Sequence, residues 1–287
     1  MRAFCRCIVC RKRVAFCAAG AALCALLALA GTVRAALRPA SPLPVIMYHS
    51  VVTDPAGAGM YAVTAQTLEE DFRFLRRAGC VSLTAGEAAA LAEKGEPLPE
   101  NSVVITFDDG YLNCLTEALP LLERYDLKAT VAVIGSCCET YAETPDPNPA
   151  YACLDWEQIG ALAQSGRIEI AAHSYAMHSL WPRKGASRRK GESEAAYREA
   201  LRADTEKVLT LLEENCGLRP TTYVYPYGAV SGESFPVLRA AGFTAALTCR
   251  EEVNRVAGTD GLLVLGRFNR PSGVSTAAFM EKIGICG

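Results

Sequence analysis

Histidine is scarce in this 287-residue chain, which contains only His49, His173 and His178. Signatures of nucleotide binding are missing, since we find no P-loop, no glycine-rich dinucleotide turn and no internal repeat. The formal net charge is only −2, so no global basic field favours binding to nucleic acid. These absences argue against nucleotide-binding and nucleic-acid-binding proteins, and a neutral polymer is a fitting ligand.

The N-terminal segment has no charged residue between positions 14 and 33, and five Arg and Lys residues precede this stretch. About 20 apolar residues span a bilayer, and a basic N-terminal flank predicts a cytoplasmic end. We therefore expect residues 1–40 to be a cytoplasmic basic tip plus a transmembrane anchor or signal peptide. The length favours an uncleaved anchor, although residues 33–35 loosely fit a cleavage site. Residues 41–287 are then the exported functional domain.

Thirteen cysteines are present, five of them within the first 40 residues. The other eight form an even number, which is compatible with disulfides in an oxidising compartment. Cys137 and Cys138 lie at the start of a proline-rich segment expected to be a loop, residues 136–152, and Cys153 directly follows it. A local disulfide and buried free thiols both remain open there.

Short apolar runs alternate with amphipathic helical patterns from residue 43 onward. We expect helices at residues 68–78, 114–125, 156–164, 194–216, 234–241 and 277–283. Strands are expected at residues 45–48, 103–107, 129–134, 168–172, 222–225 and 244–247, with a further apolar run at 262–265. Repeated β-α units predict an α/β fold with a parallel sheet, and about seven strands favour a barrel.

Two adjacent carboxylates, Asp108 and Asp109, follow an apolar, β-branched run that is typical of a buried strand. Because like charges repel, the pair needs a cation, a shared proton or full solvation. Asp-Asp-Gly is also ordinary turn chemistry. His173 and His178 follow another predicted strand, and in a barrel these strand ends meet at one rim.

The five-residue spacing of the two histidines restricts how they can act together. On a helix it would rotate them by about 140° relative to each other, so they could not bind one ion. On a loop after a strand, His173 and His178 can converge. With Asp109 they would supply the two imidazoles and one carboxylate of a hydrolytic zinc site or a related divalent-metal site.

Three motifs together resemble the polysaccharide deacetylase (NodB-like) superfamily, carbohydrate esterase family 4. They are the sequence TFDDG at residues 106–110, the histidine pair at 173 and 178, and YPYG at residues 225–228. The match runs from about residue 43 to the C-terminus. It implies a distorted (β/α) barrel, the NodB homology domain, and a metal-dependent hydrolase that removes N-acetyl groups.

The resemblance also implies a role for each matching residue. Asp109, His173 and His178 would hold one divalent metal ion, zinc in first place, with cobalt or nickel also suited to this ligand set. Asp108 would be the general base that activates water. The Tyr111 backbone amide would help to stabilise the oxyanion. This assignment agrees with the general chemistry of metal-assisted hydrolysis.

Three positions depart from the commonest family pattern. In the commonest family pattern the two histidines are four residues apart. That pattern has an Arg at the position of Val224 and a His at the position of Arg267. Arginine cannot donate a proton near neutral pH, because its pKa exceeds about 12. The histidine spacing, YPYG and the sequence MYHS at residues 47–50 resemble the branch containing biofilm poly-N-acetylglucosamine deacetylases.

In that branch the early histidine is the candidate general acid, which here is His49. A core histidine that caps a strand is the alternative. Arg267 is hypothesised to replace the absent Arg in orienting Asp108. Tyr225 and Tyr227 would form an aromatic wall for a sugar ring, with core packing as the competing interpretation.

The sequence therefore predicts a hydrolase that removes N-acetyl groups from a cell-surface or wall polysaccharide of the poly-N-acetylglucosamine or peptidoglycan type. We expect a monomer that contacts the membrane through its N-terminal segment, binds no nucleic acid, and has an extracellular catalytic domain, secreted if the leader is cleaved. Two alternatives remain, an amidohydrolase acting on a small non-glycan substrate and a non-catalytic, metal-stabilised wall-binding module. Retention of both Asp108 and Asp109 disfavours the binding module, which would need only the ligands.

Overall fold

The structure is a computed structural model that describes residues 40–286. The predicted membrane anchor or signal peptide lies outside these residues. Within the described range, none of the helices combines the length and the apolar character needed to cross a membrane.

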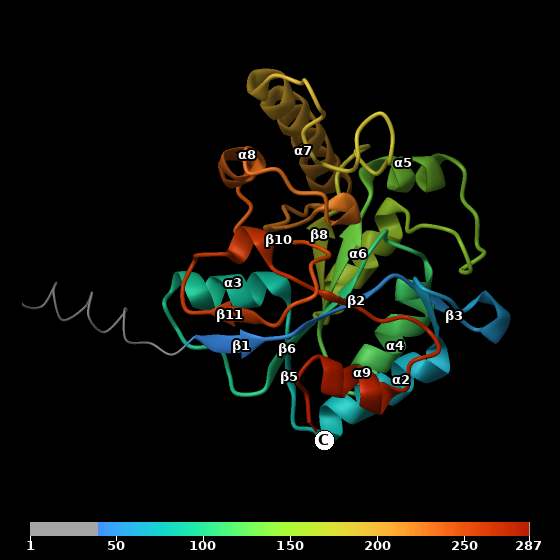
Figure 1. Cartoon of the computed structure of the whole chain (residues 1–287). Coiled ribbons are helices and arrows are strands. Elements are labelled where there is room, and N and C mark those ends of the chain that lie inside the picture. Colours follow the sequence, from blue (N-terminus) through green and yellow to red (C-terminus); the bar gives the residue numbers. More distant parts are fainter. Residues whose placement is uncertain (1–39, 287) are drawn as a thin grey trace, which may run out of the picture. The chain divides into compact units, whose positions relative to one another are not determined.

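One parallel sheet forms the centre of the described part (Figure 1). Its strands run in the order β10-β9-β8-β7-β6-β2-β12, and β5 (Val81–Leu83) pairs with β6 outside this path. Every pairing in this sheet is parallel. The seven are β2 (Val45–Tyr48), β6 (Ser102–Phe107), β7 (Ala129–Val133), β8 (Ile168–Ala172), β9 (Thr222–Val224), β10 (Ala245–Leu247) and β12 (Phe268–Asn269). The predicted parallel sheet of about seven strands is confirmed.

The two ends of the sheet approach each other, so the sheet curls into a distorted half-barrel. Leu265 donates a backbone hydrogen bond to Ala246 (2.9 Å) and accepts one from Thr248 (2.8 Å), which links β10 to the segment that leads into β12. The apolar run 262–265 was expected to continue the series of strands, but Leu262–Val264 is a 3-10 turn. Gly261 precedes it with φ +80°, and this turns the chain before a strand can form.

Two separate two-stranded sheets and short turns accompany the central sheet. β1 (Ser41–Leu43) pairs antiparallel with β11 (Asn254–Val256), and β3 (Ser50–Val52) pairs with β4 (Ala62–Thr64). Short 3-10 turns occur at Pro55–Gly57 and Pro226–Gly228. None of these short elements was predicted from the sequence.

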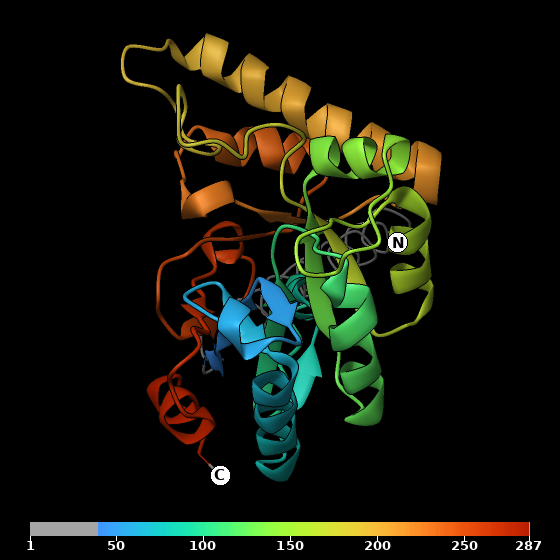
Figure 2. The ribbon, with the colours of Figure 1, turned by 90° about the vertical axis from the view of Figure 1, so that its right-hand side faces the viewer.

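Helices surround the sheet, and the longest, α7, crosses one end of the molecule beside α8 (Figure 2). Its sequence sets both ends, since Ser193 caps the first turn and Gly217 takes the left-handed conformation at the last. The helices are α2 (Ala65–Arg77), α3 (Ala85–Glu93), α4 (Leu119–Arg124), α5 (Gly135–Glu143), α6 (Trp156–Gln164), α7 (Glu194–Cys216), α8 (Ser234–Ala241) and α9 (Thr276–Lys282).

Four helices differ from the sequence expectation. The expected helix 114–125 begins as a π-helix, Cys114–Ala118, and α4 covers only Leu119–Arg124. α5 forms where a proline-rich loop was expected, because the prolines begin only after its last turn. α3 was not predicted at all, although a Thr84–Glu87 capping box starts it. α2 begins three residues earlier than expected because Thr64 caps it, and this places Asp71 on the buried face rather than in the first turn.

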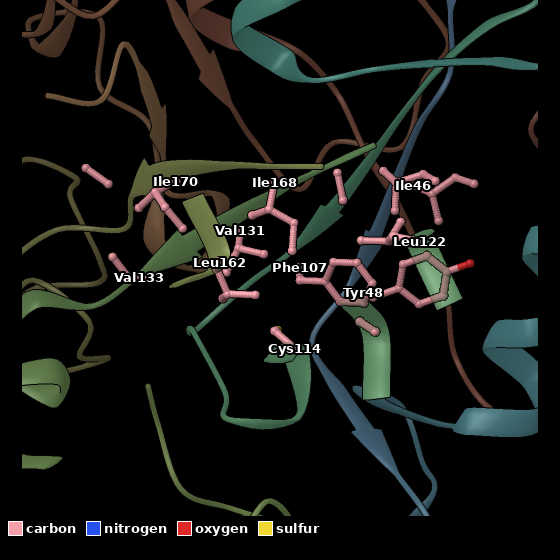
Figure 3. Close-up of a cluster of buried hydrophobic side chains, with 14 of the residues drawn as sticks. Ile46, Tyr48, Phe107, Cys114, Leu122, Val131, Val133, Leu162, Ile168 and Ile170 are labelled. Atoms are coloured by element: carbon pink, nitrogen blue, oxygen red, sulfur yellow. The ribbon is translucent and has the colours of Figure 1, made fainter. Parts of the chain in front are cut away.

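The core lies on both faces of the sheet, which explains why the centre of β6, Val103–Ile105, is a continuous apolar run. Val103, Ile105 and Phe107 pack into one hydrophobic cluster, while Val104 belongs to a second one. A strand buried on both faces has no polar alternation. Figure 3 shows part of the larger cluster, in which Phe107 and Tyr48 stack with their ring centroids 5.2 Å apart.

Candidate active site

The predicted site residues gather at the carboxyl ends of the parallel strands. His49 directly follows β2, Asp108 and Asp109 follow β6, and His173 follows β8. Parallel strands present these ends at one edge, so residues distant in sequence meet there. The tight turn after β9 adds Tyr227 to the same edge.

Three side chains converge as a donor trio, which consists of Asp109, His173 and His178. Asp109 Oδ1 lies 3.5 Å from His173 Nε2 and 3.3 Å from His178 Nε2. This oxygen is buried and has no hydrogen-bond partner, which is costly unless a ligand or ion satisfies it. The trio therefore fits a divalent metal ion, since a carboxylate and two imidazoles with open positions are the donors of hydrolytic sites.

Neighbouring groups fix the orientation of both imidazoles. His173 Nδ1 lies 2.7 Å from the carbonyl oxygen of Val224, so its N–H donates there and Nε2 faces Asp109. The Tyr227 hydroxyl lies 3.3 Å from His178 Nδ1, and the two rings have centroids 4.5 Å apart. Such contacts to the second ring nitrogen are typical of metal-ligating histidines.

The backbone around the trio is strained. Asp109, Ser174 and Tyr227 have φ values of 68°, 69° and 58°, in the left-handed region that non-glycine residues rarely adopt. Gly110 continues this turn, and a Cβ there would lie 3.0 Å from the Val133 side chain. Strained residues of this kind cluster at functional sites, where surrounding contacts hold them.

The carboxylate and the imidazoles of the trio favour each other's charged forms. Burial by itself would raise the pKa of Asp109, but the neighbouring His173 and His178 more than offset this and hold it well below its usual range. Burial would lower the pKa of His173, yet the carboxylates of Asp109 and Asp108 raise it. Asp109 is therefore ionised and available as a ligand.

The second carboxylate, Asp108, forms a buried pair with Arg267. Arg267 donates from Nη1 to Oδ1 (2.6 Å) and from Nη2 to Oδ2 (2.8 Å), and its side chain has no exposed surface. Further bonds to the Thr248 carbonyl and the Thr106 hydroxyl fix the guanidinium. Burial raises the pKa of Asp108, but Arg267 outweighs it and the pKa is lowered. The structure thus brings together the two residues that the sequence hypothesis paired.

His49 also lies at this edge. Its Nε2 is 3.9 Å from Asp108 Oδ2, and its ring lies 4.8 Å from that of Tyr61, measured between centroids. Burial lowers the pKa of His49, although Asp108 and Asp109 act against this. The buried Nδ1 has no hydrogen-bond partner. His49 is thus placed to exchange a proton near Asp108.

One predicted substrate contact is wrong. Tyr225 is fully buried, its hydroxyl shares a hydrogen bond with Ser234, and its ring packs edge-on against Tyr223. It belongs to the core because its strand neighbours bury it, and it cannot form a sugar-binding wall. Tyr227, by contrast, is 38% exposed beside His178.

The two tryptophans of the chain also differ in exposure. Trp181, three residues after His178, is 83% exposed, while Trp156 packs against the core at the start of α6. Tyr111 pairs with Cys153 through an isolated antiparallel bridge, which holds the Tyr111 backbone next to the Asp109 turn.

Sequence reasoning missed a second buried pair near the site, Asp71 with Arg270. Arg270 Nε lies 2.8 Å from Asp71 Oδ2, and both side chains are fully buried. Tyr48, the residue before His49, donates its hydroxyl to the same oxygen at 2.9 Å. No local pattern marks this pair, since its members are 199 residues apart.

Comparison with known proteins identifies the class to which this site belongs. Residues 95–246 match the polysaccharide deacetylase family, so the chain belongs to it. A relative is the poly-beta-1,6-N-acetyl-D-glucosamine N-deacetylase of Escherichia coli strain K12, which is 27% identical over 246 residues. The alignment covers 79% of this chain but only 37% of that protein. The chain therefore spans well under half the length of this relative.

Solved structures show the same fold. The de-N-acetylase from Aggregatibacter actinomycetemcomitans is 23% identical with a TM-score of 0.69, and the match covers 84% of this chain and 100% of that chain. The BpsB deacetylase domain from Bordetella bronchiseptica is 27% identical with a TM-score of 0.63, and the match covers 81% and 97%. The expected NodB-type barrel is thus confirmed.

Proposed function

We propose that this chain hydrolyses N-acetyl groups of a cell-surface polysaccharide, of the poly-N-acetylglucosamine or peptidoglycan type, and releases acetate. The observation that carries this proposal is the different surroundings of two adjacent carboxylates. Asp109 faces two imidazoles, whereas Asp108 is clamped by Arg267 beside His49. Family membership and the name of the Escherichia coli relative support a glycan substrate.

We assign one divalent metal ion to Asp109, His173 and His178, with zinc as the first expectation and cobalt or nickel as alternatives. When bound, such an ion supplies Lewis-acid chemistry, which polarises an acetamide carbonyl and makes water more acidic. The orphaned Asp109 oxygen and the fixed imidazoles are what suit these residues to the role.

Asp108 is the proposed general base, which takes a proton from the attacking water. Arg267 holds both carboxylate oxygens and keeps Asp108 ionised, so the base is oriented before substrate arrives. His49 is the proposed acid that delivers a proton to the leaving amine, since its Nε2 lies 3.9 Å from Asp108. The Tyr111 backbone amide is the proposed donor to the carbonyl oxygen as charge develops there.

Exposed aromatic groups beside the trio are the proposed sugar contacts. Tyr227, whose ring lies beside that of His178, and Trp181, three residues after His178, both expose their rings to solvent. Aromatic faces suit the apolar faces of pyranose rings. We further propose that the N-terminal segment tethers the protein, as a monomer, to the membrane with this site outside the cell.

Acetate release is the direct test. Purified full-length protein, loaded with zinc, cobalt or nickel in turn, is incubated with N-acetylglucosamine oligomers, peptidoglycan and acetylated xylan. We expect acetate from the N-acetylglucosamine polymers and none after chelation. Polymer binding without acetate from any substrate and metal would contradict the proposal and favour a wall-binding module. Acetate from small amides alone would favour an amidohydrolase.

A further inference from the structure

Three cysteines that the proposed chemistry does not use lie close to the donor trio. Cys137 and Cys138 belong to the first turn of α5, and Cys153 lies between α5 and α6. All three are free thiols in the structure. Cys138 is 1% exposed, whereas Cys137 and Cys153 are only partly buried.

Backbone contacts bring Cys137 and Cys153 to the same place. Cys137 lies in the first turn of α5, the helix that follows β7, and donates its amide to the Ile134 carbonyl at 3.0 Å. Cys153 pairs with Tyr111, flanked by bonds from Leu112 to Ala152 (2.7 Å) and from Leu154 to Gly110 (2.8 Å).

Close packing joins these two segments. A Cβ on Gly110 would lie 3.3 Å from the Val133 Cα, so the turn after β6 rests on the end of β7. Cys153 is bonded alongside that turn, and Cys137 lies in the first turn of the helix that follows β7, so the backbone places the two cysteines on neighbouring segments. Cys138 points from the same turn into the core instead.

We propose that Cys137 and Cys153 form a disulfide that links α5 to the turn bearing Asp109. The backbone placement carries this proposal, and the state of the thiols supports it. The Cys153 thiol lowers the pKa of Cys137 to about 7, whereas burial raises the pKa of Cys138. Cys137 is thus the partly exposed, reactive member.

The bond would connect the two halves of the donor trio. The first turn of α5 is hydrogen-bonded to the histidine loop, from Gly135 to Ser174 (3.1 Å) and from Ser136 to Tyr175 (2.9 Å). That loop runs from His173 to His178. A disulfide would join Cys137, in the first turn of α5, to Cys153. Cys153 pairs with Tyr111, which is two residues after Asp109. The bond would therefore hold the histidine and aspartate sides of the site together.

The oxidant is a disulfide of a small molecule or of a protein. The Cys137 thiolate attacks it, a mixed disulfide forms, and one oxidant thiolate leaves. Cys153 then loses its proton and displaces the second oxidant sulfur, so the new S–S bond forms as the mixed one breaks. Two cysteine thiols are oxidised, and their two electrons and two protons pass to the oxidant, which is reduced to two thiols.

Peptide mapping tests this directly. No Lys or Arg lies between Lys128 and Arg167, so trypsin releases all three cysteines on one peptide. Cleavage after Glu139 and Glu143 then separates Cys153 from the other two. Full-length protein is equilibrated with oxidised glutathione, quenched in acid, alkylated and digested without reductant. We expect a linked pair of peptides, which reduction separates.

Single substitutions identify which cysteines form the disulfide and show how the bond changes the melting temperature. Cys137→Ala and Cys153→Ala should lose the linked peptides, and Cys138→Ala, the matched control, should keep them. Oxidised protein should melt about 5–10 °C higher than reduced protein, and only the first two variants should lose this difference. Linkage through Cys138, or unlinked thiols in the oxidised wild type, would overturn the proposal. Acetate release is a separate assay, so either proposal can fail alone.

Discussion

Two buried Arg–Asp pairs of similar geometry lie on either side of β12. Arg267 holds Asp108 at 2.6 and 2.8 Å, and Arg270 holds Asp71 at 2.8 and 3.1 Å. All four side chains are at most 3% exposed. The pairs differ in what else touches the carboxylate.

The end of β2 supplies the contrast, because its last residue, Tyr48, and the next residue, His49, face different carboxylates. Tyr48 donates to Asp71, which also accepts a bond from Thr276 at 2.6 Å, so its oxygens are engaged by neutral donors as well as by Arg270. His49 faces Asp108 at 3.9 Å without a hydrogen bond. Under the proposed mechanism, the Arg–Asp pair serves structure where further donors engage the carboxylate, and it serves reactivity where the titratable His49 faces it.

Replacing a member of the donor trio should have the largest effect on activity. It should leave both buried Arg–Asp pairs intact. Asp109→Ala or His178→Ala removes a proposed ligand, so we expect bound metal and acetate release both to fall to background. Elemental analysis and an acetate assay on one preparation measure this. Full metal content in either variant would refute the ligand assignment.

The two residues at the end of β2 offer a matched comparison. His49→Gln should lower turnover by about 10²–10⁴-fold, the usual contribution of an acid, and should alter the pH–rate profile. Tyr48→Phe should leave turnover unchanged and cost about 1 kcal/mol of stability, because it removes one bond to Asp71. An unaltered profile in His49→Gln would mean that another group is the acid.

Replacing Asp71 and replacing Asp108 should lower the free energy of unfolding by different amounts. Asp71→Asn leaves a buried arginine incompletely paired and should cost about 3–5 kcal/mol in urea unfolding. Asp108→Asn disrupts the same kind of pair but also removes repulsion from Asp109, so its cost in metal-free protein should be smaller. Equal losses would show that both pairs are purely structural.

Arg267 should act through the pKa of the base. Burial raises the pKa of Asp108 and Arg267 lowers it, so Arg267→Gln leaves burial unopposed and the pKa rises. Because a base acts when deprotonated, the acid limb of kcat/KM should move upward by about 1–3 pH units. Arg250→Gln, at an exposed position, is the control. An unmoved limb would mean that Arg267 does not tune Asp108.

Local patterns predicted the parallel sheet and the members of the trio. Both depend on short-range signals, since apolar strands, caps and the Asp-Asp-Gly turn are readable within a few residues. Even the pairing of Arg267 with Asp108 was hypothesised from the sequence, because this chain has Arg267 where the commonest family pattern has a histidine.

Long-range packing explains what was missed. Asp71 lies in a predicted helix, but nothing local shows that Arg270 meets it. Tyr225 looked like a sugar contact, because a strand residue's facing depends on which neighbours cover it. The start of α5 depends on bonds to Ser174 and Tyr175, which are remote in the sequence.

The most direct test of the divided roles is Asp108→Asn, with metal content and acetate release measured on the same folded sample. The variant keeps the trio, so we expect wild-type metal stoichiometry together with a loss of turnover of about 10²–10⁴-fold. Wild-type turnover would contradict the assignment of Asp108 as the base. Loss of the metal would contradict the division of labour between Asp108 and Asp109.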